Sequence, residues 1–151
     1  MTRRRRVILT VTSGPNAGDT LKVDEGTCRL IGRHLSEHET ALIDRDGNRI
    51  LDAGAAEILI KHLKERAPAT GITAPPEFSS AAFDRGPDAI FADDSISRAH
   101  AMIFFDTKGI GIIDLASTNG TYVNSERVGS AMVRDGDTLA IGGSELALAV
   151  H

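Results

Sequence analysis

Short extended runs separated by turn residues constrain the fold of this chain more than any other feature of its sequence. Apolar and β-branched residues recur in short runs, with glycine, asparagine and aspartate in the turns between them. These runs are residues 7–12, 21–23, 27–31, 101–105, 110–113, 121–123, 138–141 and 146–150. Short strands at regular spacing predict an all-β sandwich of about eleven mostly antiparallel strands.

Residues 34–87 interrupt this rhythm, and we interpret them as an insertion. Within it, residues 41–43 and 49–51 can pair as a hairpin across an Asp-Gly turn. Asp52 then stands at the N-cap position of a helix over about 53–66, where apolar residues recur at helical spacing. The insertion is therefore expected to carry one α-helix.

Pro68 ends the predicted helix, and residues 67–87 have the composition of a flexible Pro/Ala/Ser-rich linker. We expect one domain over residues 1–151, with a basic N-terminal tail at residues 1–6. The insertion has two interpretations. It is either a tolerated surface excursion, because long loops add little closure entropy, or an appended element that gates a site or binds a partner.

Composition excludes several classes of partner. The net charge is −4 and aromatic residues make up 4%, which argues against general binding to nucleic acid or to anionic membranes. Cys28 is the only cysteine, so an internal disulfide is impossible and a small buried residue is expected. No apolar run has the length of a membrane span or a signal peptide. We expect a monomer in the reducing cytoplasm.

Two motifs resemble metal sites without meeting their requirements. Residues 34–38 have the H-x-x-E-H order of inverted zinc proteases, but they follow a strand end in a short loop and lack a third ligand. Residues 44–48 suggest a calcium loop, but Gly47 is misplaced and no glutamate closes the loop. We predict no metal and no cofactor.

Three polar clusters carry the functional signal. They are Gly32-Arg33, residues 95–100 and residues 114–121, and each lies at the end of a predicted strand. Loops at the ends of strands in a rigid sandwich commonly hold binding residues. We therefore expect these clusters to form the site.

Their chemistry suits a phosphate group carried on a peptide. Arg33 can present a bidentate guanidinium, and Ser97 and Thr118 can donate hydroxyl hydrogen bonds. Asn119 can both donate to and accept from a peptide backbone. These residues include no nucleophile with an adjacent base and no carboxylate cluster for magnesium. The clusters therefore predict binding rather than catalysis.

Taken in order, the three clusters resemble the signature stretches of the forkhead-associated (FHA) domain family. The flanking sequences resemble family positions too. The matching stretches are Gly32-Arg33, Ser97-Arg98-Ala99-His100 and Ser117-Thr118-Asn119-Gly120-Thr121, with Ser13-Gly14-Pro15, residues 87–91, Tyr122-Val123-Asn124 and Asp135-Gly136-Asp137 around them. The resemblance covers residues 7–33 and 88–150 and implies the FHA-type β-sandwich.

The resemblance also implies a role for each site residue. Arg33 and Ser97 would hold the phosphate with help from Thr118, Asn119 would bind the peptide main chain just after the phosphothreonine, and Arg98 would contact the peptide at the rim. The remaining positions would support the site: His100 braces the loop behind Ser97, and Gly32, Gly120 and Asn124 maintain the local backbone.

The implied function is phosphothreonine-peptide recognition, which mediates phosphorylation-dependent protein–protein interaction in Ser/Thr-kinase signalling. The phosphorylated partner would be another protein or a segment of the same polypeptide, and the module could be the sensing domain of a larger regulator such as a transcription activator. The family places only a handful of residues where this chain has the segment between Arg33 and Asp88. The alternative is therefore an FHA-fold module that associates without phosphate, with the insertion blocking or replacing the phosphate site.

Overall fold

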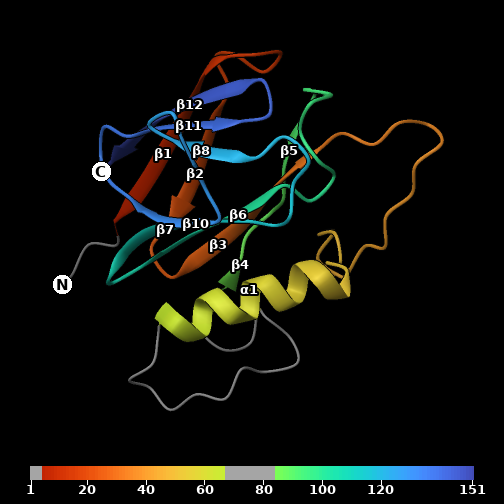
Figure 1. The fold of residues 1–151 in the computed structure, drawn as a ribbon, viewed down its shortest axis with the longest axis horizontal. Coiled ribbons are helices and arrows are strands. Elements are labelled where there is room, and N and C mark those ends of the chain that lie inside the picture. The colour runs from red at the N-terminus through yellow and green to blue at the C-terminus, as the bar shows by residue number, and fades with distance from the viewer. Residues whose placement is uncertain (1–4, 67–83) are drawn as a thin grey trace.

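Two six-stranded β-sheets stack face to face in the computed structural model, which describes residues 5–66 and 84–151 (Figure 1). The expected all-β sandwich with one α-helix is confirmed. The described residues form twelve strands rather than about eleven, and one of them, β4 (Asp84–Arg85), has only two residues.

The first sheet is antiparallel throughout, and in it the first strand of the chain pairs with the last. Its strands in spatial order are β2 (Thr20–Asp24), β1 (Arg6–Ser13), β12 (Ser144–Val150), β11 (Thr138–Ile141), β8 (Thr121–Val123) and β9 (Glu126–Val128). On β1, Val7, Leu9 and Val11 are buried while their neighbours are exposed or half-buried, as alternation predicts. Leu9 pairs with Leu148 of β12.

The second sheet carries the polar clusters. Its strands are β10 (Ser130–Val133), β7 (Gly109–Asp114), β6 (Ala101–Asp106), β3 (Thr27–Arg33) and β4, with β5 (Ala89–Phe91) also paired to β3. β3 is parallel to β4 and β5 and antiparallel to β6. In β6 and β7 nearly every residue is buried, so both faces of this sheet are covered.

The inner face is covered by the other sheet, and the outer face is covered by the helix α1 (Ala53–Arg66) (Figure 1). Asp52 caps this helix, because its Oδ1 accepts a hydrogen bond from the Ala55 amide at 2.8 Å. Ala55 and Leu59 of the helix belong to a second core with Cys28, Leu30, Met102, Phe104, Ile113 and Leu115. Residues 53–59 therefore complete the core and are not a surface excursion.

Cys28 is fully buried in this second core. Burial raises the pKa of its thiol to about 12, with the charge of Arg85 opposing the shift. The thiol is therefore neutral and packs as a small apolar group.

The expected hairpin in the insertion forms only in part. A single bridge pairs Ile43 with Arg49, and Asp44 Oδ1 accepts from the amides of Asp46 and Asn48 in the turn. This hairpin is fixed to the sandwich, because the Asp88 amide donates to Asn48 Oδ1 at 3.1 Å.

The ends of the described segments refine the expected boundaries. β1 begins at Arg6, whose Nε lies 2.6 Å from Asp24 Oδ1, so the basic tail is shorter than residues 1–6. Pro68 and most of the expected linker at residues 67–87 lie outside the described residues. Within the described part of the chain, no helix has the length and apolar character needed to cross a bilayer.

We predict that Gly111→Ala destabilises the protein. A Cβ at Gly111 on β7 would stand 2.2 Å from Phe104 Cζ, so the ring would have to leave its place against α1. Overpacking of this kind costs about 1–3 kcal/mol. Gly129→Ala is the matched control, because nothing lies within 4 Å of its added Cβ. Urea unfolding of both variants measures the difference, and equal stability of the two would contradict the packing of Phe104.

Candidate functional site

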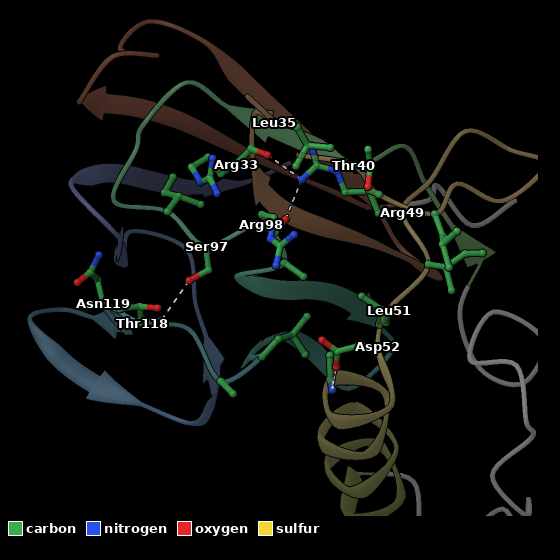
Figure 2. Close-up of a pocket in the computed structure, with 18 of the residues that line it drawn as sticks. Arg33, Leu35, Thr40, Arg49, Leu51, Asp52, Ser97, Arg98, Thr118 and Asn119 are labelled. Atoms are coloured by element: carbon green, nitrogen blue, oxygen red, sulfur yellow. Dashed lines mark hydrogen bonds between the residues drawn. The ribbon is translucent and has the colours of Figure 1, made fainter. Parts of the chain in front are cut away.

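The three polar clusters meet at one end of the sandwich. Arg33 ends β3, residues 92–100 connect β5 to β6, and residues 115–120 connect β7 to β8. All five residues predicted to contact a ligand line one pocket of about 690 Å³ (Figure 2). These residues are Arg33, Ser97, Arg98, Thr118 and Asn119.

Hydrogen bonds hold the second and third clusters together. The Thr118 amide donates to Ser97 Oγ at 3.1 Å, so the Ser97 hydroxyl proton remains available to donate to a ligand. The Asn119 side-chain amide donates to the Ser95 carbonyl at 2.7 Å. Thr118 and Asn119 are both exposed. The arrangement leaves short polar groups facing solvent on a fixed backbone.

His100 lies behind these loops and is fully buried. Its Nδ1 accepts from the Ser97 amide at 3.0 Å, and its Nε2 lies 2.8 Å from the Gly120 carbonyl. Because an amide can only donate and a carbonyl can only accept, Nδ1 is bare and Nε2 carries the proton. One imidazole thus connects the loop of Ser97 to the loop of Asn119. Burial lowers the pKa of His100, with the Gly120 carbonyl and Asp114 opposing the shift.

Gly32 allows the loop of Arg98 to pack directly on β3. A Cβ at this position would stand 2.2 Å from the Arg98 carbonyl oxygen. Any residue other than glycine would therefore push the Arg98 backbone away from β3. The next residue, Arg33, donates its amide to the Ser97 carbonyl at 3.1 Å. Gly120 has a φ of 86°, in the left-handed region that favours glycine. Both glycines thus fix the path of a recognition loop.

The Arg33 guanidinium holds a carboxylate from the insertion. Its two terminal nitrogens each lie 2.8 Å from one oxygen of Glu39, and Arg98 Nε lies 3.8 Å from Glu39 Oε2. The Ser36 amide donates to the same carboxylate at 3.0 Å. The hydrogen bonds from Arg33, followed by those from Ser36, hold the pKa of Glu39 well below its ordinary range. Arg33 is therefore oriented to bind an anion with a fork of two donors, and it binds one already.

Comparison with known proteins identifies the family. A family model described as the FHA domain matches residues 83–142. The oxoglutarate dehydrogenase inhibitor of Corynebacterium jeikeium is 33% identical over 109 residues, which cover 71% of this chain and 71% of that protein. The chain belongs to the FHA domain family. The predicted family is confirmed.

Other FHA proteins match over shorter segments or at lower identity. The glycogen accumulation regulator GarA of Mycobacterium tuberculosis is 45% identical over 60 residues, which cover 38% of this chain and only 37% of GarA. The solved FHA domain of the CT664 protein from Chlamydia trachomatis covers 95% of this chain and 96% of that domain, with a TM-score of 0.55 and 20% identity. A structure solved in a study of phosphothreonine-dependent FHA domain interactions covers 97% of both chains, with a TM-score of 0.53 and 23% identity. At such identities the two structures support the fold alone.

Two carboxylates to which we assigned no role from the sequence, Asp93 and Asp114, brace the FHA loops from behind. Asp93 is buried and accepts from the Ser95 amide at 2.9 Å, the Gly143 amide at 3.0 Å and Ser144 Oγ at 2.7 Å. Burial opposes its ionisation, but the hydrogen bonds from Ser95 and Ser144 lower its pKa. Asp114 accepts from the Ser117 amide at 3.1 Å and from Thr121 Oγ1 at 2.7 Å. The spacing Asp-x-Ser or Asp-x-x-Ser, typical of side-chain-capped turns, is the signal that could have identified them.

Arg49 of the insertion is a further residue that the sequence did not reveal. One of its guanidinium nitrogens lies 2.7 Å from the Arg33 carbonyl and 2.8 Å from the Arg98 carbonyl (Figure 2). Its own amide donates to Asp88 Oδ2 at 2.7 Å. Burial lowers the pKa of Arg49, with Asp88 opposing the shift. The insertion is thus hydrogen-bonded to the backbone of two FHA site residues.

Asn124, which we expected to support the site, lies elsewhere. It occupies the turn between β8 and β9, where its side chain bonds Asp137 Oδ1 at 3.1 Å and the Thr138 amide at 2.9 Å. Neither of these partners lines the pocket. Over residues 5–66 and 84–151, no group of three or more histidine, cysteine or acidic side chains could hold a metal ion.

We predict that His100 makes stability depend on pH. Its folded-state pKa is lowered, so below about pH 6.5 the unfolded chain takes up a proton that the folded protein rejects, and stability falls by up to about 1.4 kcal/mol per pH unit. Urea unfolding between pH 7.5 and 5.5 measures this slope. His100→Gln removes it, whereas His38→Gln, at an exposed position, retains it. An unchanged slope in His100→Gln would contradict the argument.

Proposed function

We propose that this FHA module binds phosphothreonine peptides with Arg33, Ser97, Thr118 and Asn119. The observation that supports this most is the bidentate contact with a carboxylate made by Arg33, which lines the common pocket. A phosphate presents three acceptor oxygens and nearly two negative charges to the same fork of donors. Arg33 would take two of these oxygens, and the hydroxyl of Ser97 would donate to the third.

The other residues around the pocket complete the recognition. The Thr118 hydroxyl donates a hydrogen bond to the phosphate, and the Asn119 side chain hydrogen-bonds the peptide main chain after the phosphothreonine. The exposed Arg98 contacts the peptide at the rim. His100, Gly32 and Gly120 hold these groups in place through the contacts described above. Phosphate recognition by fixed donors needs no cofactor or metal.

We propose further that the partner is a protein phosphorylated by a Ser/Thr kinase in the cytoplasm, and that the module acts on it as a monomer. Two relatives carry names that describe regulation, a glycogen accumulation regulator and an oxoglutarate dehydrogenase inhibitor. Those names support a role as a regulator. We place the phosphothreonine in another protein or in the same polypeptide.

A second candidate function is association without phosphate, and the pair of Arg33 with Glu39 favours it. In that case the Glu39 carboxylate occupies the anion site permanently, and the FHA fold would bind its partner by another surface. The two functions predict different phosphopeptide affinities when Arg33 or Glu39 is substituted.

We predict that Arg33→Ala removes phosphate-dependent binding. Because the guanidinium supplies two charge-assisted hydrogen bonds, the affinity for phosphothreonine peptides falls by roughly 100-fold. Calorimetry with matched peptides carrying phosphothreonine, phosphoserine or threonine measures the effect, and wild type prefers them in that order. Arg134→Ala, an exposed arginine in the turn after β10, is the control and binds as wild type does. Equal affinity of wild type for phosphorylated and plain peptides would refute the proposal.

We predict that Glu39→Gln strengthens phosphopeptide binding. The carboxylate is charged at neutral pH and competes with phosphate for Arg33, whereas the amide keeps the shape and loses the charge. Affinity for the same phosphothreonine peptides is expected to rise by roughly two- to fivefold, the order of a surface ion pair. Glu37→Gln, which changes an exposed charge in the same loop, is the matched control. Failure of Glu39→Gln to bind any phosphothreonine peptide would favour association without phosphate.

A further inference from the structure

The pocket extends well beyond the groups that would hold the phosphate. Its volume of about 690 Å³ falls in the range of ligand pockets and leaves room for more than one side chain. Ser97, Thr118 and Asn119 lie at one end, and Leu51 and Asp52 lie at the other (Figure 2). The second end is built by residues 40–42, 49–52 and 55 of the insertion.

Two aliphatic side chains of the hairpin line this second end and remain exposed. Leu42 is 75% exposed and Ile50 is 54% exposed. The Ile50 amide donates to the Leu42 carbonyl at 2.8 Å, which places the two residues opposite each other across the hairpin. Adjacent exposed aliphatic residues that border a binding pocket are typical of an interaction surface.

This apolar wall is fixed relative to the phosphate-binding loops. Arg49, the residue before Ile50, donates to the carbonyls of both Arg33 and Arg98. Its amide is bonded to Asp88, and Asp88 is in turn bonded to Asn48. A wall with these contacts keeps a constant distance from the anion site, so it can select a residue at a fixed position in a peptide.

We propose that Leu42 and Ile50 bind an aliphatic side chain on the amino-terminal side of the phosphothreonine in the partner peptide. The inference rests on the proposed function, in which Asn119 binds the main chain that follows the phosphothreonine. Asn119 lies at the opposite end of the pocket from the insertion (Figure 2). The residues that precede the phosphothreonine therefore extend toward Leu42 and Ile50, and the pocket is continuous between them.

A phosphothreonine peptide library randomised on both sides of the phosphothreonine tests the proposal. Wild type is expected to enrich leucine, isoleucine or valine on the amino-terminal side. The variant Leu42→Ser/Ile50→Ser loses this enrichment and binds the selected peptide about tenfold more weakly, because the aliphatic contact is gone. Ile43→Ser is the matched control: it is 51% exposed on the same hairpin, does not line the pocket and retains the wild-type affinity. Thermal melting checks that all three proteins are folded.

The outcomes separate this inference from the proposed function. Phosphate-dependent binding without amino-terminal enrichment, or enrichment that survives in the double variant, overturns the aliphatic site and leaves the proposed function intact. A double variant that changes from dimer to monomer on size-exclusion chromatography, with peptide selection unchanged, assigns the wall to a second copy of this chain and overturns the inference. No phosphothreonine-dependent binding by wild type overturns the proposed function, and this inference with it.

Discussion

The sheet formed by β3, β6 and β7 is apolar on both faces, and the rest of the structure depends on covering both. The inner face packs on the other sheet. The outer face carries the apolar side chains of Met102, Phe104 and Ile113, which must also be covered. Each such side chain is worth about 1.5–3 kcal/mol when it is removed from water. Helix α1 supplies the cover. The inserted segment therefore stabilises the sheet that positions Arg33, because removal of α1 would expose the apolar outer face of that sheet to water.

The same segment also shapes the binding site. On its way from β3 to the helix it contributes Glu39 to the guanidinium, Arg49 to the backbone of two loops and two aliphatic residues to the pocket wall. In the proposed function, these features would have opposite effects on a peptide: the Glu39 carboxylate would compete with its phosphate, and Leu42 and Ile50 would bind a matching side chain. Displacing Glu39 lowers the apparent affinity of every anion by the same factor, so only the proposed aliphatic contact would distinguish one phosphopeptide from another.

Much of this could be predicted from the sequence. The alternation of apolar residues predicted the strands. Asp52 and the helical spacing of the apolar residues after it predicted α1. The loop residues predicted the family and the residues that meet in the pocket. The outer core was missed, although every residue of the run 101–105 is apolar, a pattern typical of a sheet covered on both faces. The pair of Arg33 with Glu39 had no comparable signal, because it depends on how residues 34–40 turn back after β3. Arg49 was interpreted only as part of a hairpin strand, and its contacts to Arg33 and Arg98 are set by tertiary packing.

The pairing of β1 with β12 has a consequence for how the protein folds. The first and last strands of the sandwich lie side by side, and β3 has its neighbours β5 and β6 on the far side of the insertion. Contacts between residues so distant in the chain slow folding, because loop closure must precede the stabilising contacts. On the ribosome, β1 and β2 must wait for β12 before their sheet is complete. The domain therefore gains its native structure only after residue 150 has emerged, and a chain that stops before β12 leaves the edge of β1 open to pairing with other chains.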